Sequence, residues 1–277
     1  MQWMAAVERL RSRREAGVLV TVAAVRGHSP REAGAKMVVS ADAAWGSVGG
    51  GNLEAVAIDK ARAMLADPAA IPDMFTADLS DKAPLEHGVQ CCGGQVTVLL
   101  EPLAVLASVA IFGMGHVGHE LARILARHDL DLHVVDSRPG QLTDAMLAPL
   151  GDAEARVHTH HVPVLPELVL GGLPWGTHVL VMTHDHAEDA AIIDAALRTT
   201  HLGSIGLIGS SAKWSRFRCK LLAEGHDEQT LARVTTPIGV PELTGKQPAV
   251  IAVGIAAALL RSFQHEAAPH FWEAPRS

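Results

Sequence analysis

The sequence predicts an α/β protein with two domains, the larger of which contains a doubly wound parallel sheet. Three observations predict this fold class. After residue 103, strand-length runs alternate with helix-length segments. The strand-length runs are apolar throughout, as in a parallel sheet that helices cover on both faces. One run leads directly into a glycine motif that opens a helix. Glu101-Pro102 marks the change of pattern, so we predict a smaller N-terminal α+β domain over residues 1–103 and an α/β domain over residues 104–277.

The composition argues against several classes of protein. A chain of 277 residues with 48% hydrophobic and 19% charged residues has enough apolar surface to fold. Its net charge of -7 disfavours a nucleic-acid partner, which clustered Lys and Arg would bind. The longest apolar run, residues 249–260, is shorter than the roughly 20 residues of a transmembrane helix. We recognise no secretory signal, so we expect a cytoplasmic protein with no membrane partner, whose three cysteines are thiols.

Short β-branched runs and one amphipathic helix build the predicted N-terminal domain. Strands are expected at residues 18–25 and 36–40, joined by a turn-rich, hairpin-like connection. A helix is expected up to Ala66, with Asn52 as its N-cap. A last strand is expected over residues 96–101.

Three glycines precede the predicted helix of this domain. We predict an anion cradle at Gly49, Gly50 and Gly51, because consecutive small residues expose backbone amides to a phosphate. A flexible loop without a ligand explains the same residues equally well.

Parallel strands and a closing helix are expected in the C-terminal domain. The helix is apolar almost all round, which predicts that it is largely buried. The strands are expected at residues 108–112, 131–135, 178–182 and 204–208, and the helix at residues 247–261.

The strand over residues 108–112 ends in a G-x-G-x-x-G motif. Gly113 permits the tight turn, Gly115 lets backbone amides approach a phosphate, and Gly118 allows the helix to pack closely on the strand. His116 stands at the start of this helix, whose N-terminus attracts anions. Asp136 ends the next strand, where such folds place the carboxylate that accepts a ribose hydroxyl. These features predict a Rossmann-like domain with a dinucleotide site, although the glycines alone also fit a purely structural turn.

Two further loops follow strands of the same sheet, at the edge where α/β proteins bind ligands. His184 lies in the loop after residue 182, and Gly209 and Ser210 follow residue 208. Ser210 can also cap the next helix, and this structural role is the favoured interpretation. His184 and His186 are a poor metal signal, because a pair at this spacing lacks the remaining ligands of a metal cluster.

Adjacent thiols mark the end of the N-terminal domain. Cys91 and Cys92 precede two glycines, whose exposed amides can stabilise a thiolate suited to soft metals or sulfur chemistry. The alternative is a pair of small, half-buried residues at the start of a strand. Cys219 falls on a predicted helix, and we interpret it as structural.

Ordered motifs run along nearly the whole chain. In the N-terminal domain they are Ser29-Pro30-Arg31, Gly34-Ala35-Lys36-Met37, Gly46 through Gly51 with Glu54, and Gln90-Cys91-Cys92-Gly93-Gly94. In the C-terminal domain they are Gly113 through Gly118, Val135-Asp136-Ser137-Arg138, Thr183-His184-Asp185-His186, Gly206 through Ser210 and Pro237-Ile238-Gly239. Together they resemble the XdhC/CoxI family of xanthine dehydrogenase accessory proteins, from which Met114 and His28 are small departures.

This resemblance implies a chaperone rather than an enzyme. Family members bind the molybdenum cofactor (molybdopterin) as cargo, hold it while a cysteine desulfurase helps to supply its sulfido ligand, and insert it into xanthine dehydrogenase. By this resemblance we expect a homodimer, with the molybdenum-binding subunit of xanthine dehydrogenase as the client. Cys92 is the favoured molybdenum contact. The expected cofactor-binding residues are Gly49, Gly50, Gly51, Cys91, Cys92, Gly113, Gly115, His116, Gly118, Asp136, His184, Gly209 and Ser210.

Two other functions remain open from the sequence. The glycine motif and Asp136 by themselves also predict an NAD(P)-dependent oxidoreductase, with NAD or another nucleotide at the Rossmann site. A regulatory module that senses a nucleotide is the second alternative. The sequence also leaves open which domain holds the cofactor and whether the client is an aldehyde- or carbon monoxide-oxidising relative of xanthine dehydrogenase.

Overall fold

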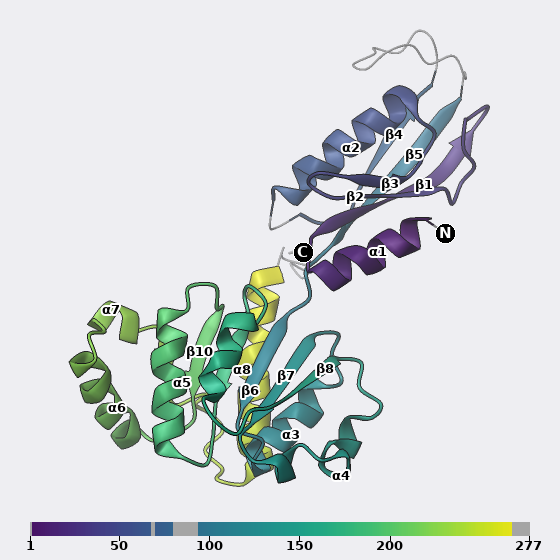
Figure 1. Cartoon of the computed structure of the whole chain (residues 1–277). Coiled ribbons are helices and arrows are strands. Elements are labelled where there is room, and N and C mark those ends of the chain that lie inside the picture. The colour runs from purple at the N-terminus through teal and green to yellow at the C-terminus, as the bar shows by residue number, and fades with distance from the viewer. Residues whose placement is uncertain (1, 68–69, 80–93, 268–277) are drawn as a thin grey trace, which may run out of the picture. The chain divides into compact units, whose positions relative to one another are not determined.

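The computed structural model describes residues 2–67, 70–79 and 94–267 and divides into two compact units (Figure 1). The units are Met1–Val105 and Leu106–Phe263. The first contains an antiparallel sheet and the second a parallel sheet, so the predicted α/β class is confirmed. None of the helices in the described residues is long and apolar enough to cross a bilayer.

A five-stranded antiparallel sheet forms the first unit, with strand order β3-β2-β1-β5-β4. Alternate residues of its strands face opposite sides, where different helices cover them. Val18 and Val20 of β1 pack in the core with Leu53 of α2, whereas Leu19 packs with Leu10 of α1. The elements are α1 (Gln2–Arg13), β1 (Gly17–Arg26), β2 (Lys36–Val39), β3 (Ala44–Gly46), α2 (Gly51–Leu65), β4 (Asp73–Asp78) and β5 (Gln95–Leu103).

The start of α2 differs from the prediction. The N-cap residue is Gly50, with φ of 72°, so the expectation that Asn52 caps this helix was wrong. Asn52 lies inside the first helical turn. A carboxylate from that turn, on Glu54, accepts the hydrogen bonds of the preceding loop instead.

Six parallel strands form the sheet of the second unit, in the order β11-β10-β9-β6-β7-β8. In chain order this is 3-2-1-4-5-6, so the connections change direction between the neighbours β6 and β9. Ligands of open α/β sheets bind beyond the carboxyl ends of the strands at such a switch point. The strands are β6 (Ser108–Phe112), β7 (Asp131–Asp136), β8 (Arg156–His161), β9 (His178–Val181), β10 (Ser204–Leu207) and β11 (Val234–Thr235).

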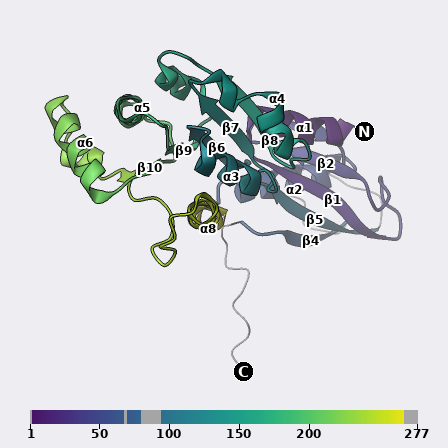
Figure 2. The same cartoon turned by 90° about the horizontal axis from the view of Figure 1, so that it is seen from below.

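Helices cover both faces of this sheet, as Figure 2 shows for α5 on one side and α3 with α8 on the other. Ala110 and Phe112 of β6 point into the core beneath α5, whereas Val109 and Ile111 point into the core beneath α3 and α8. Both faces of each central strand are therefore buried, which explains the continuous apolar runs. The helical elements are α3 (His116–Leu125), η1 (Pro139–Gln141), α4 (Asp144–Leu147), η2 (Ala148–Leu150), η3 (Pro166–Gly172), α5 (His186–Arg198), α6 (Ser211–Ala223), α7 (Glu228–Leu231) and α8 (Pro248–Ala267).

Candidate functional site

The three glycines of the turn between β6 and α3 have different surroundings. Gly113 has φ of 106°, and a Cβ atom there would lie 2.4 Å from the carbonyl oxygen of Met182. A Cβ at Gly118 would lie 2.2 Å from the carbonyl oxygen of Gly113, so only glycine lets α3 pack this closely on the turn. Apart from Gly115 itself and its chain neighbours, no atom lies within 4 Å of the Cβ position at Gly115. Gly113 and Gly118 therefore shape the turn, whereas Gly115 leaves space into which a ligand can approach the backbone.

Asp136 ends β7 next to this turn and is almost fully buried, with 3% of its surface exposed. One carboxylate oxygen accepts hydrogen bonds from the Met114 amide at 2.7 Å and from Nη2 of Arg138 at 2.9 Å. The other accepts from the Arg138 amide at 2.8 Å and from Nε of Arg138 at 2.9 Å. Burial by itself would raise the pKa of Asp136, but these donors hold it below its ordinary value. The carboxylate thus clamps the glycine turn, and its predicted contact with a ribose hydroxyl remains a prediction.

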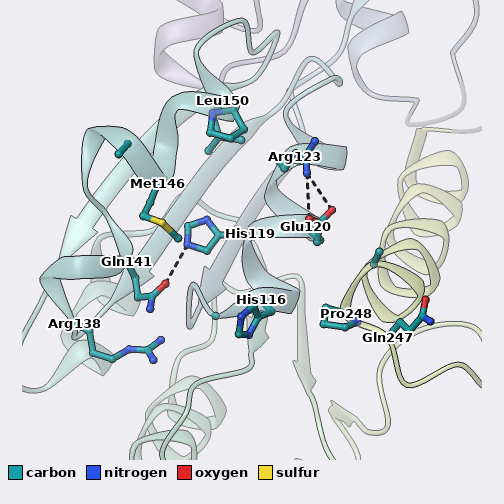
Figure 3. A pocket seen from close by; sticks show the side chains of 14 residues that line it. His116, His119, Glu120, Arg123, Arg138, Gln141, Met146, Leu150, Gln247 and Pro248 are labelled. Atoms are coloured by element: carbon teal, nitrogen blue, oxygen red, sulfur yellow. Dashed lines mark hydrogen bonds and ion pairs between the residues drawn. The ribbon is translucent and has the colours of Figure 1, made fainter.

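A cavity of about 770 Å³ opens beside Gly115 (Figure 3). His119 from α3 reaches across it to Gln141 of η1, with 3.2 Å between Nε2 and Oε1. Arg123 pairs with Glu120 on the same helix at 3.1 Å. Polar and charged side chains from α3 and η1 thus form part of the wall of the cavity. Its wall includes Gly115, His116, His119, Arg123, Arg138 and Gln141.

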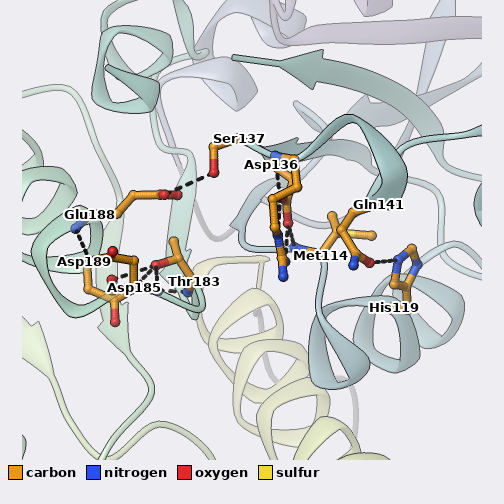
Figure 4. A network of polar contacts seen from close by, with 10 residues as sticks. Met114, His119, Asp136, Ser137, Gln141, Thr183, Asp185, Glu188 and Asp189 are labelled. Carbon is orange, nitrogen blue, oxygen red and sulfur yellow. Dashed lines mark hydrogen bonds and ion pairs between the residues drawn. The ribbon is translucent and has the colours of Figure 1, made fainter. Parts of the chain in front are cut away.

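A second polar network, centred on Asp189, joins the loops that follow β9 and β10. Figure 4 shows its contacts between Thr183 and Asp189. Asp189 is fully buried and accepts hydrogen bonds from the amide and the hydroxyl of Thr183, at 3.0 and 2.8 Å. Lys213 of α6 donates to the other carboxylate oxygen of Asp189 at 2.5 Å and to the carbonyl oxygen of Ile208 at 3.0 Å. This buried pair holds the two loops together, although its residues lie 24 positions apart in the sequence.

The predicted residues of these loops have mainly structural contacts. Ser210 is the N-cap of α6, and its hydroxyl accepts a hydrogen bond from the Lys213 amide. Gly209 has φ of 155°, and a Cβ there would lie 2.7 Å from the Lys213 side chain. His184 is exposed on the loop after β9, whose next residue, Asp185, caps α5. Their predicted contacts with a ligand remain predictions.

Glu188 of α5 faces the loop that follows β7. The hydroxyl of Ser137 donates a hydrogen bond to its carboxylate at 3.0 Å. Burial raises the pKa of Glu188 above its ordinary value, although the Ser137 hydrogen bond and the nearby His184 act in the opposite direction. This contact joins the β7 end of the sheet to the α5 side of the switch point, so residues from both halves of the sheet meet there.

The glycine loop of the first unit already binds an anion from its own chain. Glu54 accepts hydrogen bonds from the amides of Val48 and Gly50, at 3.2 and 3.1 Å, and from the hydroxyl of Ser47 at 2.6 Å. An external phosphate would have to displace this carboxylate. The predicted anion cradle over Gly49, Gly50 and Gly51 therefore remains a prediction. Two backbone amides of this loop region already donate hydrogen bonds to Glu54.

Other motif residues of the first unit lie close together. A Cβ at Gly49 would lie 2.7 Å from the Pro30 ring, so the glycine loop packs against the Ser29-Pro30-Arg31 segment. A Cβ at Gly94 would lie 2.1 Å from the carbonyl oxygen of His28. The last residue of the cysteine motif thus lies beside the residue that precedes the Ser29-Pro30-Arg31 segment. Cys91 and Cys92 themselves lie outside the described residues.

Two family profiles match the chain. That of the XdhC Rossmann domain covers residues 109–259, and that of the XdhC and CoxI family covers residues 10–71. The chain belongs to the XdhC family.

Named relatives of this XdhC-family protein are distant. It is 24% identical over 237 residues to the uncharacterized protein YqeB of Escherichia coli strain K12, a match that covers 85% of this chain and 41% of YqeB. The chain thus spans about two fifths of the length of that relative. A crystal structure described as a xanthine dehydrogenase from Bacillus halodurans is 20% identical, covers 98% of this chain and 99% of its own, and has a TM-score of 0.48. The NAD-dependent formate dehydrogenase of Staphylococcus aureus in complex with NAD is 16% identical, covers 59% of this chain and 50% of its own, and has a TM-score of 0.27. Both TM-scores lie below 0.5, so the family assignment rests on the profiles.

Several residues of the candidate site were not predicted as contacts from the sequence. Arg138 was noted only within a family motif, and its position two residues after Asp136 is the signal that could have identified it. His119 and Gln141 meet across the cavity from separate elements. Lys213 has no local signal, because its partner is distant in the sequence. Across residues 2–67, 70–79 and 94–267, no group of three His, Cys, Asp or Glu side chains is placed to hold a metal ion.

Proposed function

We propose that this protein is a chaperone for the molybdenum cofactor. It binds the cofactor as cargo, holds it while a cysteine desulfurase partner supports sulfuration, and inserts it into the molybdenum-binding subunit of xanthine dehydrogenase. The observation that carries the proposal is the match of both parts of the chain to XdhC-family profiles. We place this work in the cytoplasm and assign it to a homodimer.

The geometry of the Rossmann unit supports the proposal. Molybdopterin carries a phosphate, and a phosphate fits the open space at Gly115, where the N-terminus of α3 presents backbone amides. Arg138 and His119 line the adjacent cavity. A carrier must also release its cargo, which argues for a Kd on the order of 1 μM, about -8 kcal/mol, rather than the tightest known affinities. Transfer then requires tighter binding by the client enzyme.

The two adjacent cysteines provide a direct test. We expect the Cys91→Ser/Cys92→Ser double variant to lose most of its retained molybdenum and its ability to activate apo-xanthine dehydrogenase, because a hydroxyl is a much poorer ligand than a thiolate for a soft metal. Anaerobic reconstitution, with molybdenum and pterin assayed in parallel, measures both effects. Cys219→Ser, which changes an exposed free thiol on α6, is the matched control and should behave as the parent protein. Full activity of the double variant would contradict the proposed thiol contact.

Nucleotide binding by the Rossmann unit is a second candidate function. The observation that favours it is the 3-2-1-4-5-6 strand order combined with the glycine turn at the switch point. Saturable binding of NAD or NADH with turnover of a substrate would support an NAD(P)-dependent oxidoreductase. Tight binding of a nucleotide without turnover, and without retention of molybdopterin, would support a sensing module.

A further inference from the structure

The carboxylate that would accept a ribose hydroxyl is already saturated. The two oxygens of Asp136 accept four hydrogen bonds from the amides of Met114 and Arg138 and from the Arg138 guanidinium. Only 3% of the residue is exposed. A ribose 2′-hydroxyl would have to displace a charge-assisted hydrogen bond, which is stronger than the neutral one it brings. We therefore expect a ribose with a free 2′-hydroxyl to bind weakly at this position.

A ligand in the cavity would contact Arg138 rather than Asp136. Its guanidinium binds Asp136 through Nε and Nη2 and lines the cavity beside Gly115. Nη1 makes no hydrogen bond with any part of the chain that the structure describes. About a third of the Arg138 side chain is exposed, compared with 2% of the Asp136 side chain behind it. Within this ion pair, the Arg138 guanidinium therefore faces the cavity, and the Asp136 carboxylate lies buried behind it.

The charges around the cavity favour an anion at Arg138. His116 and His119 line the same cavity, and a ring N–H of each can donate a hydrogen bond to a bound phosphate. The carboxylate of Glu120 opposes this effect, but it is paired with Arg123 at 3.1 Å. Rossmann folds that bind NADP use an arginine near this strand end to accommodate the 2′-phosphate. A planar guanidinium suits this role because it binds phosphate oxygens through parallel N–H groups.

We infer that the Rossmann unit selects adenine nucleotides that carry a 2′-phosphate over those with a free 2′-hydroxyl, and that Arg138 is the residue that contacts this phosphate. The inference rests on the second candidate function, nucleotide binding by this unit, and not on the chaperone proposal. Asp136 then acts as a positioning residue, which holds Arg138 and the Met114 amide in place.

Three matched ligands test the inference on the full-length protein by isothermal titration calorimetry. Adenosine 2′,5′-bisphosphate and 5′-AMP differ only in the 2′-phosphate, and adenosine 3′,5′-bisphosphate has the same charge at another position. We expect the 2′,5′-bisphosphate to bind at least tenfold more tightly than either of the others, a difference of about 1.4 kcal/mol. NADP and NAD should show the same order.

Variants of Arg138 separate a direct contact from a structural role. Arg138→Ala should weaken binding of the 2′,5′-bisphosphate at least tenfold and leave 5′-AMP binding unchanged or tighter, because Asp136 becomes free to accept a hydroxyl. A residue that only supported the fold would weaken both ligands equally. Arg138→Lys, which keeps the charge without the planar fork, should retain part of the preference. Arg127→Ala is the control, because it removes a cation that pairs with Asp152 and does not line this cavity.

Each remaining outcome overturns a stated part of the account. Equal binding of 5′-AMP and the 2′,5′-bisphosphate would overturn the inference and leave nucleotide binding intact. Equal binding of the two bisphosphates would show a general anion effect and also overturn it. If Arg138→Ala still preferred the 2′,5′-bisphosphate over 5′-AMP, Arg138 would not be the residue that contacts the 2′-phosphate. Failure of every nucleotide to bind at millimolar concentration would overturn both the inference and the second candidate function, whereas the chaperone proposal is tested separately with molybdopterin.

Discussion

Lys213→Met is expected to lower the free energy of unfolding of the C-terminal unit by about 3–5 kcal/mol, because it leaves the carboxylate of Asp189 buried without its counter-ion. For a unit of this size the loss corresponds to a decrease in Tm of about 6–20 °C. Methionine keeps most of the apolar volume of the lysine side chain beside Gly209, so the change isolates the charge. Differential scanning calorimetry or urea unfolding measures the effect.

Two further variants control this experiment. Lys220→Met removes an exposed lysine from the same helix, 3.7 Å from Glu224, and should change stability little because exposed pairs contribute little. In the double variant Lys213→Met/Asp189→Asn, the neutral amide still accepts the hydrogen bond from the Thr183 amide, so most of the lost stability should return. A loss below about 1 kcal/mol in Lys213→Met alone, the range of solvated pairs, would contradict the buried character of the pair.

Gly118→Ala is expected mainly to lower stability, whereas Gly115→Ala is expected mainly to weaken ligand binding. A methyl group at Gly118 would overlap the carbonyl oxygen of Gly113, so α3 must move away from the turn at a cost of about 1–3 kcal/mol or more. Gly115 is the N-cap of α3, with φ of -78° and open space at its Cβ position, so alanine there meets no clash and should lower stability by at most about 1 kcal/mol, the cost of a weaker N-cap residue. The same methyl group would obstruct a phosphate that approaches the Gly115 backbone, and binding should weaken.

Thermal unfolding and ligand titration distinguish these two glycines. Adenosine 2′,5′-bisphosphate and molybdopterin serve as the probes, with unfolding recorded on the same preparations. Equal destabilisation by both substitutions would contradict the division between a structural and a ligand-facing glycine. If Gly115→Ala bound both probes as tightly as the parent protein, the turn between β6 and α3 would not be part of the ligand site.

Strands of the parallel sheet could be predicted where both faces are buried, because such strands are apolar at every position. The run before Gly113 shows this, because β6 is buried over all five residues. β8 was not predicted, since it is an edge strand rich in histidine with exposed residues such as His158 and His161. β11 has only two residues and gives no periodic signal. The helix α1 was also missed, because the N-terminal segment was considered only as a possible signal peptide.

The candidate site was predictable only in part, for a related reason. A glycine motif is local, so its position after β6 and before α3 could be inferred from a few residues. The partners of Asp136 and Asp189 depend on which donors the fold brings within hydrogen-bond distance. The same holds for Glu54. Its carboxylate accepts a hydrogen bond from the glycine loop, where the sequence predicted an external phosphate.

Cofactor retention by the purified apo-protein tests the central claim most directly. The protein is mixed anaerobically with molybdopterin cofactor and separated from free cofactor by gel filtration, and molybdenum and pterin are assayed in the protein peak. Co-elution of both at a fixed ratio to protein is the result that the chaperone proposal predicts. A protein peak without molybdenum or pterin, together with saturable binding of NAD in a parallel run, would contradict it.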